Sequence, residues 1–96
     1  MKAYIIGDIT ITDPVRYEDY KKLTQATLEP YGGKFVVRGG PRTVLEGDWD
    51  AGRIVVLEFP SQEKAKAWYE GEVYAPAKKI RQSASKGKFV LVEGIE

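Results

Sequence analysis

The 96-residue sequence contains no cysteine and no histidine. The absence of cysteine excludes a disulfide scaffold, a thiolate nucleophile and Cys-ligated zinc or iron–sulfur sites. The absence of histidine excludes Ser-His-Asp and Cys-His catalysis and removes the usual imidazole ligand of metals and haem. No acidic run has the spacing of an EF-hand calcium loop. We therefore expect no metal and no cofactor. Proton transfer or isomerisation is favoured over redox chemistry, with cofactor-free oxygenation as the alternative.

The sequence also lacks a long apolar stretch and a strong charge of either sign. It enters a strand-like run directly after Met1-Lys2, without the pattern of a signal peptide or membrane helix. A net charge of +1 gives no electrostatic attraction to nucleic acid or anionic membranes. We therefore expect a cytoplasmic protein that binds neither. A chain of 96 residues fits a single domain, 1–96, whose small core would gain from a partner.

Hydrophobic periodicity and turn residues predict the element order β-α-β-β-α-β. The predicted strands are 3–11, 34–38 with a continuation at 43–46 after a bulge, 53–59 and 88–93. Two helices are predicted, one that follows Asp13-Pro14 and ends at Gly32-Gly33, and one that follows Ser61, breaks near Gly71 and Pro76 and resumes over 77–85. This order defines a ferredoxin-like α+β fold with the first and third strands in the centre of the sheet.

The two central strands have apolar side chains on both faces. In the third predicted strand, Val55, Leu57 and Phe59 point to one face and Ile54 and Val56 to the other. In the first predicted strand, Ala3, Ile5 and Ile9 point to one face and Tyr4 and Ile6 to the other. An antiparallel sheet with one face in water should instead alternate apolar and polar residues. Two helices can cover only one face of a four-stranded sheet. We therefore expect a homodimer through the other sheet face, unless these runs only reflect the general apolarity of central strands.

Two carboxylates and one arginine form the first candidate site. Asp8 and Glu58 each lie near the C-terminal end of a central strand. We expect these strands to be parallel neighbours, so both carboxylates should lie at the same sheet edge, where mutual repulsion can poise one as an acid or base. Pairing Glu46 with Arg53 brings Arg38 within a few residues of Glu58. Arg38 then either clamps an anionic substrate or forms a structural pair with Glu58.

Aromatic side chains on the two helices form the second candidate cluster. Tyrosine suits a pocket wall because it combines an apolar ring with a polar tip. Tyr17 and Trp68 are the favoured wall residues, although an aromatic stripe at helical spacing more often belongs to the core. Gly39-Gly40 could present backbone N–H groups to an anion, with a turn or bulge as the alternative.

Several segments together carry a family resemblance that covers nearly the whole chain. They are Tyr17, Tyr20, 32–35 (GGKF), 38–40 (RGG), 45–47 (LEG), 53–61 (RIVVLEFPS), 67–69 (AWY), Tyr74 and Arg81. On these residues the chain resembles the bacterial family catalogued as domain of unknown function 1330, of the dimeric α+β barrel superfamily. The resemblance implies a sheet-to-sheet dimer with a pocket between sheet and helices in each subunit. The family has no established activity, but superfamily relatives include small monooxygenases, lactone isomerases and ligand-sensing domains.

Three functional hypotheses follow. The first is an enzyme acting on a small organic molecule, with Glu58 or Asp8 as acid–base and Arg38 as anion clamp. Its substrate-binding residues would be Tyr17, Arg38, Gly39, Gly40, Trp68, Tyr69, Tyr74 and Arg81. The second is a non-catalytic ligand-binding or stress-related module that uses the same pocket, and the third is a structural dimer without a pocket. Family members usually have a serine shortly after the Trp-Tyr pair, where this chain has Gly71, so any ligand contact of that hydroxyl is missing here.

Overall fold

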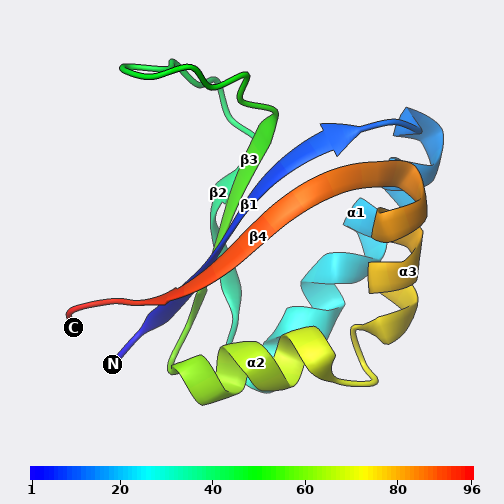
Figure 1. Cartoon of the computed structure of the whole chain (residues 1–96). Coiled ribbons are helices and arrows are strands. Elements are labelled where there is room, and N and C mark those ends of the chain that lie inside the picture. The colour runs from blue at the N-terminus through cyan, green and yellow to red at the C-terminus, as the bar shows by residue number, and fades with distance from the viewer.

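One face of a four-stranded antiparallel sheet is covered by three α-helices in the computed structural model, which describes residues 1–96 (Figure 1). The elements are β1 (Ala3–Ile11), α1 (Pro14–Leu28), a 3-10 turn (Glu29–Tyr31), β2 (Lys34–Arg38), β3 (Arg53–Phe59), α2 (Gln62–Glu70), α3 (Ala75–Ala84) and β4 (Ser85–Glu93). The strand order is β2-β3-β1-β4. The predicted ferredoxin-like α+β fold is confirmed, with β1 and β3 in the centre. No helix is both long and apolar enough to span a membrane.

The helix boundaries follow the capping residues that the sequence indicates. Asp13 accepts a hydrogen bond from the backbone N–H of Arg16 at 3.1 Å and caps α1. Gly32 adopts a left-handed conformation with φ of 69° and ends the helical segment. Ser61 caps α2 through the N–H of Lys64. The expected break near Gly71 is complete, so α2 and α3 are separate helices with different directions (Figure 1).

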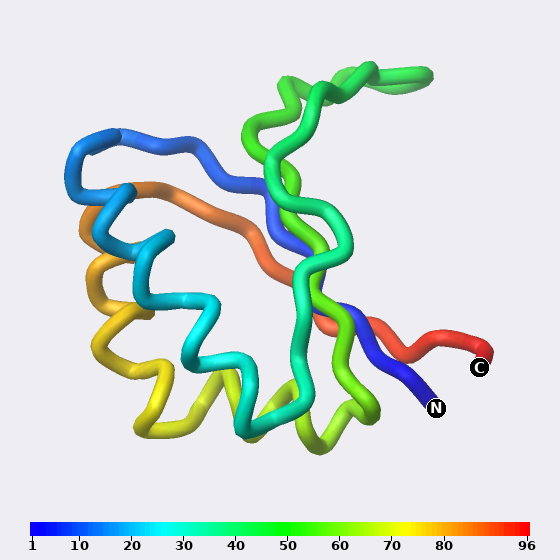
Figure 2. Tube along the Cα trace, turned by 180° about the vertical axis from the view of Figure 1, so that it is seen from behind, coloured from blue at the N-terminus to red at the C-terminus, as the bar shows by residue number.

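Two predicted strand boundaries are wrong. The segment 43–46 is not a strand, because β2 ends at Arg38 and 39–52 forms a loop that projects away from the helices (Figure 2). Gly39 turns the chain with φ of 69° and donates its N–H to the carbonyl of Ile54 at 2.8 Å. The last strand begins at Ser85 rather than Lys88, because β1 extends far enough to pair Ile11 with Ser85.

The prediction that the two central strands are parallel is also wrong. β1 and β3 pair antiparallel, with Tyr4 opposite Glu58 and Asp8 opposite Ile54. In this topology each helical crossover joins two parallel strands that have another strand between them. The parallel partners are therefore β1 with β2 and β3 with β4, and Asp8 and Glu58 lie at opposite ends of the sheet.

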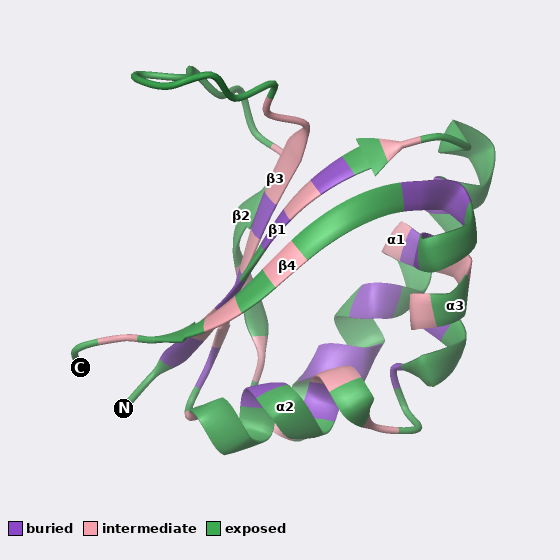
Figure 3. Ribbon diagram, viewed as in Figure 1, coloured by how far each residue is buried: buried purple, intermediate pink, exposed green.

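The hydrophobic core lies between the sheet and the helices (Figure 3). Its largest fully buried side chains are Trp68, Tyr74, Phe59, Ile9, Leu28 and Thr24. The other sheet face, which we call the outer face, remains apolar but uncovered. On it Ile6, Val90 and Val92 are 37%, 56% and 44% exposed, respectively. The predicted two-sided apolar pattern is therefore present, and the helices cover only one side.

Candidate functional site

A small cavity lies between the helices and the inner face of the sheet, and we call it the inner chamber. Its volume is about 20 Å³, which is room for about one water molecule. It is lined by the aromatic residues Tyr17, Tyr20, Phe35, Trp68, Tyr69, Tyr74 and Phe89, the aliphatic residues Ile5, Ile9, Val55 and Leu57, Thr24, and the cationic residues Lys21, Arg38 and Arg53. No aspartate or glutamate lines it. The chamber is thus an aromatic space with positive charge on its walls.

Two larger clefts adjoin this chamber on the β4 side. The cleft between α2 and β4 has a volume of about 230 Å³, and the cleft that Arg81 and Ser85 border, between α3 and β4, has about 170 Å³. Tyr69 and Phe89 border the chamber and both clefts. Their ring centres are 6.5 Å apart. These two side chains therefore form the partition between three adjoining hollows.

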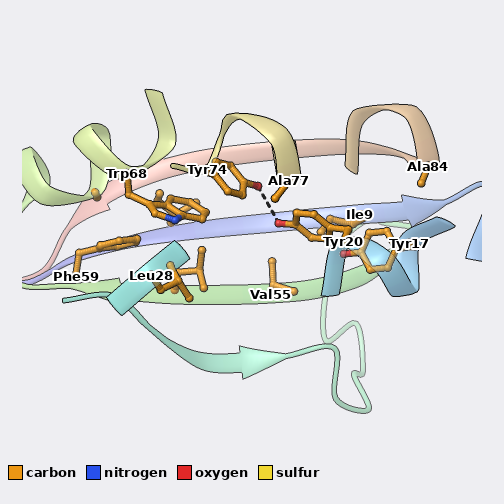
Figure 4. Packing of buried hydrophobic residues seen from close by; sticks show 13 residues of the cluster. Ile9, Tyr17, Tyr20, Leu28, Val55, Phe59, Trp68, Tyr74, Ala77 and Ala84 are labelled. Atoms are coloured by element: carbon orange, nitrogen blue, oxygen red, sulfur yellow. Dashed lines mark hydrogen bonds between the residues drawn. The ribbon is translucent and has the colours of Figure 1, made fainter. Parts of the chain in front are cut away.

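The deep wall of the chamber is a fixed aromatic cluster. The hydroxyls of Tyr20 and Tyr74 form a buried hydrogen bond of 2.8 Å (Figure 4). Trp68 stacks on Tyr74 with ring centres 3.9 Å apart, and its indole N–H donates to the hydroxyl of Thr27 at 3.0 Å. Burial raises the pKa of Tyr74, and the neighbouring Tyr20 adds to this effect. The polar groups of this wall are already paired, so it shapes the chamber rather than reacting in it.

Tyr17 differs from that wall because it lies beside positive charge. Its side chain is buried, and the guanidinium carbon of Arg53 lies 5.7 Å from the centre of its ring. Burial raises the pKa of Tyr17, and Tyr20 raises it further, whereas the guanidinium groups of Arg53 and Arg81 lower it. At neutral pH the phenol therefore keeps its proton and is a hydrogen-bond donor close to two cations.

The two arginines beside Tyr17 have no acidic partner. Arg81 is only 3% exposed, and its Nε has no hydrogen-bond partner. Its guanidinium lies 4.0 Å from the ring centre of Phe89, and Nη2 is 3.4 Å from the hydroxyl of Tyr69. The Nε of Arg53 is likewise buried and unpaired.

The ion pairs of the protein all use lysine: Lys2 and Lys34 with Glu58, and Lys21 with Glu18. A buried cation without an acidic partner is costly, so an anion bound at Arg81 would remove an existing penalty. Arg53 is half-buried, and an anion bound there would give its buried Nε an acceptor.

Arg53 is the site residue that the sequence interpretation missed. Its position was visible in the pattern, because strand alternation places residue 53 on the same face as Val55, Leu57 and Phe59. The structure puts Arg38 in the chamber wall too, where it lies over Phe35 at 4.2 Å and donates to the carbonyl of Lys21 at 3.2 Å.

The Gly39-Gly40 pair does not present a free backbone N–H at residue 39, because that N–H is bonded to Ile54. Gly39 has another role. A Cβ at this position would collide with the guanidinium of Arg53, so the missing side chain makes room for the arginine. Around Gly40 there is open space, with no atom within 4 Å of an added Cβ.

Asp8 and Glu58 lie on the outer face, away from the chamber. Asp8 accepts hydrogen bonds from the indole N–H of Trp49 at 2.7 Å and the backbone N–H of Gly52 at 2.9 Å. Glu58 lies 3.4 Å from Lys2 and 3.8 Å from Lys34. The expected proximity of these carboxylates is wrong, because their strands are antiparallel.

The predicted approach of Arg38 to Glu58 is wrong as well. A bulge between Phe35 and Val37 places Lys34 opposite Glu58 and Arg38 opposite Val55. The Arg38 side chain turns to the helices instead, where it reaches α1. No three acidic side chains gather to hold a metal ion.

Gly71, which stands where the resemblance implies a serine, lies outside the chamber and both clefts. A Cβ at this position would come within 2.5 Å of the carbonyl oxygen of Ala67. The departure at Gly71 therefore concerns the end of α2 and leaves the chamber wall unchanged.

Comparison with known proteins places this architecture among related folds. A family model described as Domain of unknown function (DUF1330) matches residues 2–95. A protein of unknown function from Rhodopseudomonas palustris has a similar structure, with a TM-score of 0.80, 19% identity, and coverage of 99% of this chain and 83% of that one. No curated protein matches the chain.

Two further solved structures share the fold. A dimeric ferredoxin-like protein of unknown function from Jannaschia sp. CCS1 has a TM-score of 0.68 and 13% identity, covering 98% of this chain and 100% of that one. SnoaB, a cofactor-independent oxygenase from Streptomyces nogalater, has a TM-score of 0.63 and 13% identity, covering 99% of this chain and 94% of that one. At these identities the likeness concerns the fold.

Proposed function

As the chain belongs to the DUF1330 family, we propose that it is a small-molecule-binding protein whose ligand is an organic anion with a flat apolar body. The ligand enters from the β4 side and lies between the sheet and the helices. Its apolar body contacts the aromatic walls that Tyr69 and Phe89 share, and its acidic group contacts Arg81. Tyr17 and Trp68 keep the wall roles expected from the sequence, whereas Arg81 takes the role of anion clamp that was expected of Arg38.

The observation that carries this proposal is the burial of Arg81 without an acidic partner. Arginine presents a planar fork of N–H donors that matches a carboxylate. The guanidinium lies 4.0 Å from the ring centre of Phe89 and 5.9 Å from that of Tyr69, and these contacts fix its orientation. A carboxylate placed in the adjoining cleft of about 170 Å³ would pair with this charge.

The chamber favours ligand binding over acid–base catalysis. Acid–base catalysis by Asp8 or Glu58 would need a carboxylate near the ligand, and both residues face the opposite side of the sheet. The groups that do line the chamber donate hydrogen bonds and stabilise negative charge. SnoaB is described as a cofactor-independent oxygenase, and a chamber that stabilises an organic anion is compatible with chemistry of that kind on an easily oxidised substrate.

The binding proposal can be tested through the fluorescence of Trp68. Trp68 is 1% exposed in the chamber, whereas Trp49 is 55% exposed on the projecting loop. The variant Trp49→Phe therefore leaves one reporter, and benzoate and neutral benzyl alcohol are titrated against it at pH 7. A charge-assisted contact predicts at least about tenfold tighter binding of benzoate.

The matched variants are Arg81→Met, which keeps the apolar stem, and Arg42→Met, whose arginine lies on the loop outside the chamber. Benzoate binding should weaken about tenfold in Arg81→Met and stay unchanged in Arg42→Met. Equal affinities for benzoate and benzyl alcohol, or benzoate binding that survives Arg81→Met, would refute the anion site.

We also propose that the outer face pairs with a second copy of the chain. The exposed residues Ile6, Val90 and Val92 support this, as does the description of the Jannaschia structure as dimeric. Val90→Lys places a charge in the centre of that contact and should shift the mass in light scattering from dimer to monomer. A native protein that is monomeric at 100 μM would contradict the pairing.

A further inference from the structure

We infer that the ligand carries two acidic groups, one held by Arg81 and the other by Arg53, with the hydroxyl of Tyr17 beside them. The ligand class is a small planar organic diacid. This inference deepens the proposed function and rests on it, because it assigns a second charge to the same binding space. It adds Arg53 as a binding residue and Gly39 as the residue that positions it.

The count of uncompensated charges points to two negative groups. Five cationic side chains border the chamber and its two adjoining clefts, but three of them are already accommodated. Lys21 pairs with Glu18 at 3.1 Å, and Arg38 and Lys66 are exposed to solvent, with Lys66 in the same cleft as Glu70. Arg53 and Arg81 remain, each with a buried Nε that has no partner. One monoanion would leave one of these two guanidinium groups unpaired.

The two arginines approach the binding space from different elements. Arg53 begins β3 in the sheet, and Arg81 lies in the last turn of α3. Arg53 lines the chamber together with Phe89, and the Arg81 guanidinium lies 4.0 Å from the ring centre of Phe89. Tyr17 on α1 lies beside Arg53 in the same chamber, so side chains from the sheet and two helices converge on one region. A single ligand that bridges both arginines binds with higher affinity than a ligand that contacts only one, because its second contact forms within an existing complex.

The backbone around Arg53 is shaped for its guanidinium. Gly39 has φ of +69°, a conformation that residues with side chains rarely adopt, and its N–H fixes the turn by bonding to Ile54. The Arg53 head occupies the space that a side chain at residue 39 would need. The backbone turn at Gly39 thus leaves room for the Arg53 guanidinium, as expected for a binding residue whose orientation is fixed by its surroundings.

The ligand also needs more room than the closed chamber provides. The chamber has about 20 Å³, while the adjoining clefts have about 230 and 170 Å³. Phe89 is half-buried and borders all three, so a small rotation of its ring would open them to one another. The apolar body of the diacid then lies against the rings of both Tyr69 and Phe89.

The test compares one acidic group with two. In the Trp49→Phe background, the dissociation constant of benzoate is measured against those of phthalate, isophthalate and terephthalate, which differ in the spacing of their carboxylates. We expect at least one diacid to bind about tenfold more tightly than benzoate. Arg53→Met should bring this affinity ratio close to one, Arg53→Lys should retain part of it, and Arg42→Met should leave it unchanged. Thermal unfolding by circular dichroism confirms that each variant is folded.

The outcomes separate this inference from the function on which it rests. If benzoate binds and depends on Arg81, but no diacid binds more tightly, the two-acid ligand is refuted and the anion site stands. If a diacid preference persists in folded Arg53→Met, Arg53 is not the second anchor and the inference fails. If neither benzoate nor any diacid binds, the proposed function fails and this inference fails with it.

Discussion

Replacing Tyr74 by phenylalanine removes a single hydroxyl from the deepest wall of the chamber. That hydroxyl lies 2.8 Å from the hydroxyl of Tyr20, and the two residues are 1% and 8% exposed. The ring of residue 74 stays in place, so its stacking on Trp68 and the packed volume are preserved. The substitution therefore isolates the hydrogen bond from the hydrophobic contacts around it.

The expected loss of stability depends on the hydroxyl that remains after the substitution. Tyr74→Phe leaves the buried hydroxyl of Tyr20 without a partner, which lowers the free energy of unfolding by about 1–3 kcal/mol. Tyr20→Phe should cost a similar amount for the same reason. The double variant has no orphaned hydroxyl, so its loss should fall short of the sum of the single losses by about 1–3 kcal/mol.

The measurement is urea unfolding, followed by circular dichroism at pH 7 and at one fixed protein concentration. The native protein, the two single variants and the double variant form a double-mutant cycle, in which the urea midpoints of unfolding are compared at equal denaturant slopes. Tyr4→Phe serves as the control, since Tyr4 is half-buried and lies on the outer face opposite Glu58. Losses that add within about 0.5 kcal/mol would show that the two hydroxyls are not coupled, and the reasoning would be refuted.

Three further predictions use other parts of the structure. Burial raises the pKa of Tyr74 above its ordinary value of 10.0, so the unfolded chain loses this proton first. The free energy of unfolding should then fall as the pH rises past 10, by up to about 1.4 kcal/mol per pH unit for this group, and urea titrations of Tyr74→Phe should show a shallower fall. Gly39→Ala should lose about 1–2 kcal/mol of stability and weaken the binding of whichever diacid the native protein prefers, whereas Gly40→Ala, in open space, should change neither. Equal thermal shifts of the two variants would contradict this. Glu58→Gln should leave benzoate affinity within about twofold, since Glu58 faces away from the chamber, and a loss of about tenfold would bring this carboxylate back into the site.

The sequence is sufficient to predict the parts of the fold that depend on local chemistry. Asp13 and Ser61 cap their helices because a short polar side chain can reach a free backbone N–H, and this depends on nearby residues only. The alternation of apolar residues in β1 and β3 correctly predicts both sheet faces, because each strand side chain points opposite to its neighbours. These features require no knowledge of distant contacts.

The path of the loop and the register of β2 depend on contacts distant in sequence. The Arg38 side chain turns to α1 because a single bulged residue changes the pairing of β2 with β3. Asp8 and Glu58 were misplaced for another reason. Their adjacency assumed parallel central strands, whereas the predicted β-α-β-β-α-β order with these two strands in the centre already requires an antiparallel pairing.

The location of the site follows from asking which charged groups lack partners. Carboxylates attracted attention in the sequence because they are the usual acids and bases, but Asp8 and Glu58 both have donors around them in the fold. Arg53 and Arg81 each have a buried Nε–H without an acceptor. A cation withdrawn from water without an anionic partner lowers the stability of the empty protein, and a bound anion removes that loss. Ligand binding and folding stability are thereby linked through the same two arginines. A diacid should consequently raise the midpoint of thermal unfolding in the native protein, and this increase should shrink when either arginine is replaced by methionine.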